Sequence, residues 1–365
     1  MSITIIGAGA IGGVIGAYLI KNGEEVTFVD RDFDHVEAMN QNGLTIQIKD
    51  ESFTVPAKAF TVEDFLANHD SVDVVFLAVK ALHTKEAIRP FAKLMKDDSF
   101  VVSFQNGLCE YDIAEIVGDE KTVGCFINLF ADYLEPGIIE YGGVGSLFIG
   151  EMDGSDSERV QDLRNRLQCW GDAKATNNIF GYLWSKLSYG SMLTATALTN
   201  AEIAEFFEDS TYHPIMNAIG TEVLKVAEKE GITPEPFDNW TPSLLYPVKK
   251  EEELETSYFE LAKRLRGYTK TRTGIWRDLA VRKRKTEVFE QLNPVIRIGE
   301  KHGFDMLLIK NIVSMIQEIE SGEREMSMDN IAVLEDIKWA TVNNLMNVRN
   351  PVKLLDSDCR IYIQK

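Results

Sequence analysis

The sequence has few cysteines, and their spacing is not typical of a metal site or of a disulfide framework. Its four cysteines, Cys109, Cys125, Cys169 and Cys359, are widely separated. Nothing in the sequence indicates secretion, so an oxidising compartment is not expected. We therefore predict reduced, mostly buried thiols in a cytoplasmic protein that binds no metal.

Long hydrophobic runs and an excess of positive charge are also missing. No apolar run approaches the roughly 18 residues that a membrane span needs, and the first residues lead into a core strand rather than a signal peptide. Asp and Glu number 57 against 38 Lys and Arg, which gives a net charge of −19. Because a surface that acidic repels nucleic acid and anionic membranes, we expect neither as a partner.

The chain is nevertheless long and apolar enough for a sizeable core. It has 365 residues, of which 45% are hydrophobic, and this length favours two domains. It contains no internal repeat and no low-complexity segment.

The most informative stretch is the first thirty residues. Residues 2–6 form an apolar, β-branched run that ends in Gly7-Ala8-Gly9-Ala10-Ile11-Gly12. A helical pattern follows at 14–21, and a second β-branched run at 25–29 ends in Asp30. A strand, a glycine turn, a helix, a strand and an acid in this order predict a dinucleotide-binding unit. The alternative is a glycine turn that binds nothing, but the strand and helix on either side favour the nucleotide.

Each glycine has a physical role in such a unit. Gly7 permits a tight turn, Gly9 leaves room for a pyrophosphate beside the backbone, and Gly12 lets the helix lie close to the sheet. The helix N-terminus then attracts the phosphates.

Asp30 and Arg31 carry opposite signals about the cofactor. A carboxylate at the strand end binds the ribose 2′-hydroxyl of NAD and repels the 2′-phosphate of NADP, whereas an arginine can bind that phosphate. We favour NAD because Asp30 holds the strand-end position, although the sequence leaves NADP open.

Further strand and helix patterns follow in alternation up to about residue 178. This alternation predicts a doubly wound, open parallel sheet of the Rossmann type, with helices on both faces. In such sheets ligands bind beyond the carboxyl ends of the strands. The residues expected at these ends are Gly7–Gly12, Asp30, Lys80 and Asn106. Strands are predicted at 44–48, 53–55, 72–79, 100–104, 122–127 and 146–149, with helices at 84–95 and from about 158 to 170.

The character of the chain changes at about residue 179, where strand patterns end. We predict a dinucleotide-binding domain at 1–178, a helical substrate or dimerisation domain at 179–348 and a tail at 349–365. The segment 232–272 is rich in proline and charge, and we interpret it as a solvated connector, with a lid or dimer contact as alternatives. Helices are predicted at 180–207, 214–230, 278–292, 294–302 and 307–320, the fourth beginning at Asn293-Pro294.

Two residues of the helical domain could take part in chemistry. Lys186 lies in an otherwise apolar stretch, where burial would lower the pKa of its ammonium. Its alternative is a lysine whose stem packs while its charge reaches water. Glu287 follows the basic run Arg282-Lys283-Arg284-Lys285 and is equally compatible with a surface ion pair.

Taken together, these motifs resemble the ketopantoate reductase (2-dehydropantoate 2-reductase) family. The resemblance covers roughly residues 1–320. It depends on the order and spacing of the motifs, since none is specific alone. The motifs are the glycine turn, Ala78-Val79-Lys80, Gln105-Asn106-Gly107, Trp184-Ser185-Lys186-Leu187 and Thr286-Glu287.

The resemblance implies NAD(P)H-dependent reduction of a small 2-oxo acid, as in pantothenate biosynthesis, in a cleft between a Rossmann domain and a helical domain. It implies that Lys186 gives the proton to the 2-oxo group and that Asn106 contacts cofactor and substrate. Lys80 would lie near the cofactor, and Glu287 would position substrate and lysine.

The chain departs from the family at three substrate positions. Gly190 and Thr194 stand where the family has asparagines four and eight residues after the lysine, and Gly274, beside Thr273, stands near the family's serine. Thr194 and Thr273 could replace part of the lost hydrogen bonding. The substrate is therefore open between ketopantoate and a related 2-oxo acid. The remaining alternatives are a dehydrogenase of similar build for another hydroxy acid or an opine, and a dinucleotide-sensing protein without catalysis. A homodimer is possible.

Overall fold

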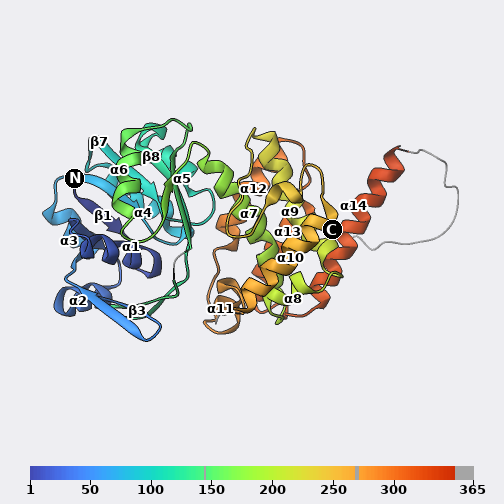
Figure 1. Cartoon of the computed structure of the whole chain (residues 1–365), viewed down its shortest axis with the longest axis horizontal. Coiled ribbons are helices and arrows are strands. Elements are labelled where there is room, and N and C mark those ends of the chain that lie inside the picture. The colour runs from blue at the N-terminus through green and yellow to red at the C-terminus, as the bar shows by residue number, and fades with distance from the viewer. Residues whose placement is uncertain (144, 268–270, 350–365) are drawn as a thin grey trace.

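The chain folds into a sheet-containing domain and a helical domain that lie side by side (Figure 1). The computed structural model describes residues 1–143, 145–267 and 271–349, with side chains as far as residue 340. Within these ranges no helix is long and apolar enough to cross a membrane. Cys359 and most of the predicted tail lie outside the described residues, whereas the last helix reaches Arg349.

The first domain is built on an eight-stranded sheet. Its strands, from one edge to the other, are β12 (Ala173–Ala175), β11 (Ser146–Glu151), β8 (Thr122–Asn128), β7 (Met95–Ser103), β6 (Val72–Leu77), β1 (Ile3–Ile6), β2 (Val26–Val29) and β5 (Lys58–Phe60). The strands from β8 to β5 in this order are parallel. Their carboxyl ends therefore meet at one edge, as predicted.

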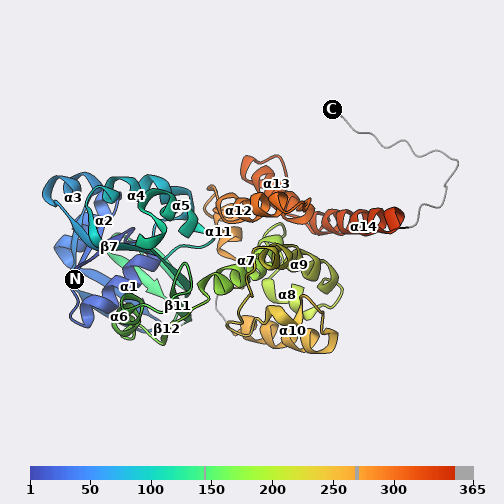
Figure 2. The same ribbon diagram turned by 90° about the horizontal axis from the view of Figure 1, so that it is seen from above.

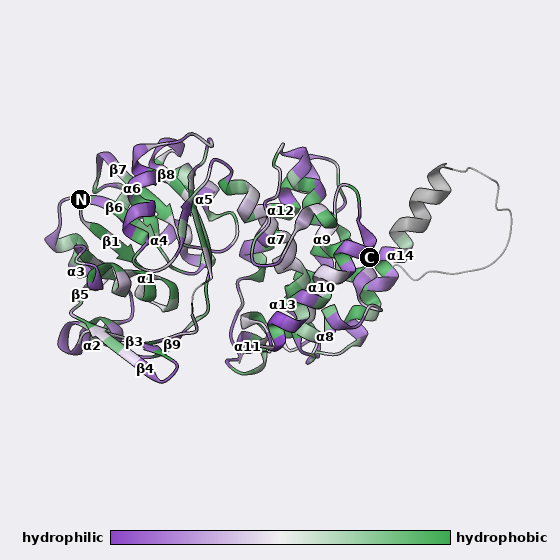
Figure 3. Cartoon of the chain, viewed as in Figure 1, coloured by the Kyte–Doolittle hydropathy of each residue, from purple (hydrophilic) through white to green (hydrophobic). Residues whose placement is uncertain are grey.

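Helices cover both faces of this sheet, which is the doubly wound arrangement that the alternating pattern predicts. The central strands are buried on both faces and hydrophobic along their length (Figure 3). One face packs on α1 (Ala10–Lys21) and α6 (Glu158–Leu167). The other packs on α3 (Val62–Asn68), α4 (Thr84–Ala92) and α5 (Cys109–Val117).

A smaller sheet extends this domain beside α1. Its order is β4 (Glu51–Val55), β3 (Leu44–Ile48), β10 (Ile138–Tyr141) and β9 (Ala131–Glu135). The helix α2 (Phe33–Asn42) leads from β2 into it. Short 3₁₀ turns lie at Ala81–His83, Asp119–Lys121 and Pro242–Leu244.

The main sheet is parallel except at one edge, where β11 runs antiparallel to β8 and β12 runs in the same direction as β11. The chain between β8 and β11 passes through β9 and β10 and contains no crossover helix. Without a crossover the returning strand must run in the opposite direction.

Among its described residues the second domain contains helices and connecting segments but no strand, apart from the isolated bridge between Phe237 and Trp240. Its buried side chains form one hydrophobic core. The helices are α7 (Ile179–Thr196), α8 (Ile203–Glu208), α9 (His213–Lys229), α10 (Glu251–Arg266), α11 (Gly274–Ala280), α12 (Val288–Lys301), α13 (Leu307–Ser321) and α14 (Asp329–Arg349). Figure 2 shows α7 leading from the sheet into this domain.

The predicted helix at 180–207 is two helices, α7 and α8. Thr199 explains the break. Its hydroxyl donates to the carbonyl of Thr196 at 3.0 Å and accepts from the amide of Ala201 at 3.0 Å. Such side-chain bonds to the backbone compete with the helical bonds.

The prediction of a new helix at Asn293-Pro294 is also wrong, because Pro294 lies inside α12. The preceding segment, 281–287, is not helical. Thr286 is instead fixed by Glu320, whose carboxylate accepts from its amide at 2.8 Å and from its hydroxyl at 2.6 Å. This long-range contact sets where α12 begins.

The interpretation of 232–272 as a solvated connector is wrong for its described residues. Trp240 is 1% exposed, and α10 buries one face against the core. The buried residues of α10 are Leu254, Tyr258, Leu261, Ala262 and Leu265, a helical spacing.

Candidate active site

The glycine turn connects β1 to α1 and has the geometry that the motif predicts. Gly7 has φ +95°, and a Cβ there would lie 2.8 Å from the amide nitrogen of Val79. A Cβ on Gly12 would lie 2.1 Å from the carbonyl oxygen of Gly7. A Cβ on Gly9 would meet nothing within 4 Å. The turn thus has no room for a side chain at Gly7 or Gly12, whereas space is left beside Gly9, the first residue before α1.

Asp30 lies at the end of β2 and binds the glycine turn directly. Its carboxylate accepts from the amide of Ala8 at 2.7 Å and from the amide of Asp32 at 3.0 Å. Each carboxylate oxygen has more than one acceptor position, so these bonds leave capacity for a ribose hydroxyl.

His35 is a residue of this region that sequence reasoning missed. It is 1% exposed, and its Nδ1 accepts from the amide of Gly137 at 2.9 Å. Its Nε2 must therefore donate to the carbonyl of Ala8, also at 2.9 Å. His35 ties the glycine turn to the smaller sheet, and a lone histidine between two polar patterns gave no signal of this role.

The N-terminus of α1 fits a dinucleotide. The backbone at Gly9 is accessible, and the helix dipole favours phosphate at this end. Arg31 is exposed next to Asp30, and its guanidinium lies 3.3 Å from His83 Nε2. The residues present that would hold a dinucleotide are Gly7–Gly12, Asp30 and Arg31.

Lys186 joins the two domains at the carboxyl edge of the main sheet. It lies on α7, which begins at Ile179 because the side chain of Asn178 accepts from the amide of Gly181 at 3.0 Å. The Lys186 ammonium donates to Asn106 Oδ1 at 2.7 Å and to the carbonyl of Ile127 at 2.5 Å. The structure thus brings together Lys186 and Asn106, 80 residues apart in the sequence.

The surroundings of Lys186 lower the affinity of its amine for a proton. Burial lowers the pKa of the Lys186 ammonium to about 8. The ring of Phe126, 5.2 Å away, covers one side. Four acidic groups oppose the effect of burial: Cys125, Asp238, Glu110 and Glu287. A lysine with this pKa can give up a proton near neutral pH.

Glu110 is a second residue that sequence reasoning missed. It is 1% exposed and lies on the first turn of α5, beside Ser103 and Cys125. Burial raises the pKa of its carboxyl to about 7. Only the fold brings it near Lys186.

Glu287 contacts the sheet domain next to Lys80. Its carboxylate accepts from the amide of Ala81 at 2.7 Å, and burial raises the pKa of this carboxyl. Lys80 itself donates to Asp278 at 3.2 Å, across the domain boundary. Both predicted residues therefore lie at this boundary, although Lys80 is paired with a carboxylate that the sequence had not indicated.

Asp278 is the centre of this ion cluster. It is 7% exposed, and its carboxylate also accepts from Arg284 at 2.9 Å and Arg282 at 3.2 Å. Burial alone would raise the pKa of the Asp278 carboxyl, but Lys80 and Arg284 hold it below its usual value. Arg282 also donates to Asp132 of β9 at 3.2 Å, so the basic run contributes to the contact between the domains.

Of the residues at the family's substrate positions, Gly190 shares a face of α7 with Lys186, whereas the hydroxyl groups of Thr194 and Thr273 bond to other groups. Gly190 lies one turn after Lys186, and a Cβ there would meet nothing within 4 Å. Thr194 is 3% exposed and donates its hydroxyl to the carbonyl of Gly190 at 2.8 Å. Thr273 caps α11 by accepting from the amide of Trp276 at 3.0 Å. Among the described side chains, the hydrogen bonds of Lys186 go to Asn106 and Ile127 rather than to either threonine.

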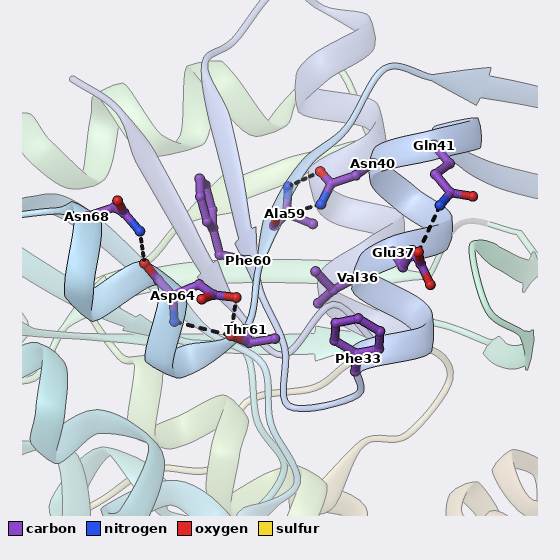
Figure 4. A pocket seen from close by; sticks show the side chains of 10 residues that line it. All are labelled: Phe33, Val36, Glu37, Asn40, Gln41, Ala59, Phe60, Thr61, Asp64 and Asn68. Atoms are coloured by element: carbon purple, nitrogen blue, oxygen red, sulfur yellow. Dashed lines mark hydrogen bonds between the residues drawn. The ribbon is translucent and has the colours of Figure 1, made fainter.

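A groove of about 430 Å³ lies elsewhere, between α2, β5 and α3 (Figure 4). Its polar side chains are engaged locally: Asn40 binds the backbone of Ala59 in both directions, and Asp64 accepts from Thr61. Lys186 and Asn106 are not among its lining residues. We assign it no part in the chemistry.

The fold and the site define a class of protein. At the carboxyl edge of a Rossmann sheet lie a glycine turn at a helix N-terminus and a lysine of lowered pKa. These are the parts of a nicotinamide-dinucleotide-dependent oxidoreductase that acts on a CH–OH group.

Comparison with known proteins identifies the family. Residues 3–154 match the model described as ketopantoate reductase PanE/ApbA, and residues 178–320 match that of its C-terminal domain. The 2-dehydropantoate 2-reductase of Pyrococcus horikoshii is 32% identical over 227 residues, 62% of this chain and 71% of that protein. That of Archaeoglobus fulgidus is 24% identical over 327 residues, 88% of this chain and 98% of that protein.

A solved structure of D-mandelate dehydrogenase with NADH has a TM-score of 0.73 at 22% identity. The match covers 88% of this chain and 99% of that one. The two family models, which together match more than half of the residues, show that the chain belongs to the ketopantoate reductase family. Reduction of an oxo acid with a nicotinamide dinucleotide follows from this membership.

Proposed function

We propose that the protein reduces a small 2-oxo acid to the 2-hydroxy acid, with ketopantoate as the first candidate substrate and Lys186 as the proton donor. The observation that carries the proposal is the position of the Lys186 ammonium. Asn106 and the Ile127 carbonyl hold it at the same sheet edge as the glycine turn.

Each residue has a defined task in this proposal. When bound, the nicotinamide supplies the hydride to the carbonyl carbon. Lys186 directs an N–H toward the carbonyl oxygen and gives it the proton as the alkoxide forms. Asn106 orients the ammonium through its Oδ1 and has its amide group available for cofactor or substrate. Glu287 lies nearby, with one oxygen anchored on Ala81, and its carboxylate holds substrate hydroxyl groups. Solvent then restores the proton on Lys186.

For the cofactor we propose NAD. Asp30 supports this choice because its carboxylate lies at the end of β2, where it would repel a 2′-phosphate. Arg31 is the residue that would favour NADP. We propose that Lys80, which follows β6, lies near the nicotinamide. A kcat/KM with NADH at least tenfold above that with NADPH is the expected result.

The substrate pocket departs from that of ketopantoate reductases at Gly190. Because a side chain there would meet open space, the site has room for a 2-oxo acid larger than ketopantoate. The similar structure of D-mandelate dehydrogenase supports a second candidate, a bulky or aromatic 2-oxo acid. Thr273, whose hydroxyl hydrogen is available, is the proposed partner of the substrate carboxylate, and Thr194 would join it on exchanging its bond to the Gly190 carbonyl for one to the substrate.

The decisive experiment follows oxidation of NADH and NADPH at ~340 nm with ketopantoate and a panel of other 2-oxo acids. Turnover of one panel member supports the proposal, and the preferred member identifies the substrate. Cofactor binding without any turnover would instead support a non-catalytic dinucleotide-binding protein.

The rate of reduction is expected to fall as the pH rises above about 8. The pKa of Lys186 is lowered by burial to about 8, so the ammonium is present below this pH and lost above it. Above it, kcat/KM should fall about tenfold per pH unit, since the proton donor titrates as a single group. A pH–rate profile between pH 6 and 10 measures this. A flat profile up to pH 10 would show that another group gives the proton.

Replacing Gly190 by asparagine is expected to restore a family contact. The new amide fits because a Cβ at this position meets nothing within 4 Å. One added hydrogen bond of about 1 kcal/mol should raise kcat/KM for ketopantoate roughly fivefold and lower it for bulkier 2-oxo acids. The control is Gly231→Asn, also in open space but distant in the fold; φ is +73° there, a backbone conformation that asparagine tolerates better than most residues. Equal effects of both variants, or no change in substrate preference, would contradict the assignment.

A further inference from the structure

The turn at residues 237–240 reaches from the helical domain back to the sheet. The Asp238 carboxylate accepts from Asn128 Nδ2 at 2.5 Å and from the Ser146 hydroxyl at 2.7 Å. Asn128 is the last residue of β8, and Ser146 is the first residue of β11. Asp238 therefore joins the ends of two neighbouring strands to the helical domain.

The turn is held in one conformation before any substrate arrives. The amide of Phe237 donates to the carbonyl of Trp240 at 3.0 Å, and the reverse bond measures 2.7 Å. Asp238 and Asn239 both have positive φ, 44° and 69°, as the two central residues of a type I′ turn do. Asn239 Oδ1 accepts from Arg264 of α10 at 2.9 Å. Non-glycine residues keep such angles only where their surroundings fix them.

The same turn contacts the residues on either side of Ile127. The carbonyl of Ile127 accepts from Lys186, and Asn128 is the next residue along β8. On the other side, the ring of Phe126 lies 4.8 Å from that of Phe237 and also covers the Lys186 ammonium. The turn therefore fixes the end of β8 that directs the lysine.

We propose that Asp238 is a positioning residue for Lys186. It holds the end of β8 so that the Ile127 carbonyl points at the lysine, and its negative charge favours the ammonium form. This inference rests on the proposed role of Lys186 as proton donor.

The charge of Asp238 acts together with other groups around the lysine. Glu110 on α5, Cys125 on β8, and Glu287 before α12 face Lys186 as well, and each raises the pKa that burial lowers. Removing the charge of one of these carboxylates should lower the pKa of Lys186 further without abolishing its function.

The test compares Asp238→Asn with Glu235→Gln. Glu235 is a matched control because it belongs to the same loop and loses the same charge, but its carboxylate accepts from Asn178, the N-cap of α7, through a bond that the glutamine oxygen keeps. Two readouts are used: kcat and KM over a pH series, and pH-dependent labelling of the Lys186 amine, followed by mass spectrometry. The second readout needs no turnover.

For Asp238→Asn we expect kcat to fall about tenfold with KM within about twofold, since the donor is misplaced rather than the substrate lost. The midpoints of the rate profile and of Lys186 labelling should both move to lower pH. Glu235→Gln should match the wild type. Equal behaviour of the two variants would overturn the proposal.

Ser146→Ala provides a second variant that keeps the charge. It removes one of the two sheet contacts, so kcat should fall about threefold while the labelling midpoint stays in place. If Asp238→Asn fails to fold, a wild-type kcat in Ser146→Ala overturns the positioning role. If the wild type reduces no 2-oxo acid, the proposed function fails, and the labelling midpoint of Asp238→Asn still tests the coupling to Lys186.

Discussion

Replacing Lys186 by alanine is expected to lower kcat for 2-oxo acid reduction by about 10²- to 10⁴-fold. The variant has no proton donor at the position where Asn106 and the Ile127 carbonyl hold the ammonium. KM should change less than kcat, because proton donation stabilises the transition state more than the bound substrate. Steady-state kinetics with NADH and the preferred 2-oxo acid measure both constants.

Two controls make this result specific. Lys85→Ala removes a surface lysine that pairs with Asp112 and Glu115, and it should leave kcat unchanged. Methylamine or a related small amine should restore part of the activity of Lys186→Ala by occupying the vacated space. A Lys186→Ala variant with more than a third of the wild-type kcat would remove the lysine from the mechanism.

Alanine at Gly9 and alanine at Gly12 are expected to abolish cofactor binding for two different reasons. At Gly9 the new methyl group has open space, so the melting temperature should stay within about 2 °C of the wild type. It stands, however, where the pyrophosphate approaches the backbone, and NADH affinity should fall about 100-fold. At Gly12 the methyl group would lie 2.1 Å from the carbonyl of Gly7 and 2.9 Å from Ile5, which forces α1 away from the sheet. Such overpacking destabilises by roughly 1–3 kcal/mol.

The two variants together separate binding from folding. Thermal unfolding and NADH fluorescence titration are measured on both. The expected pattern is loss of affinity alone for Gly9→Ala and loss of affinity and stability for Gly12→Ala. Wild-type NADH affinity in Gly9→Ala would mean that the phosphates bind elsewhere.

The parts of the molecule that the sequence predicts are those determined locally. The glycine turn, the buried strands and α7 follow from patterns within some twenty residues, and their order predicts the Rossmann sheet and the helical domain. Because parallel strands share one carboxyl edge, the sequence also predicts that Gly7–Gly12, Asp30, Lys80 and Asn106 gather there.

The rest depends on contacts between distant segments. Lys80 and Asp278 are 198 positions apart, and Asp238 and Asn128 are 110 apart. No periodicity relates such residues, so the ion cluster and the turn at 237–240 were not foreseeable. The prediction of helix ends failed for the same reason, since the contact between Thr286 and Glu320 determines where α12 begins. The cofactor preference and the roles of Thr194 and Thr273 remain predictions.

The central position of β1 has a consequence for how the chain is made. β1 lies between β2 and β6, and Ser2 binds Asp73, 71 positions later. Gly7 takes up its conformation against Ala78 and Val79, which follow β6. During synthesis β1 can pair with β2 early, but its other side stays unpaired until β6, some seventy residues further along the chain, has left the ribosome. The nucleotide-binding turn therefore reaches its final conformation only after β6 has joined the sheet, although its own residues are made some seventy positions earlier.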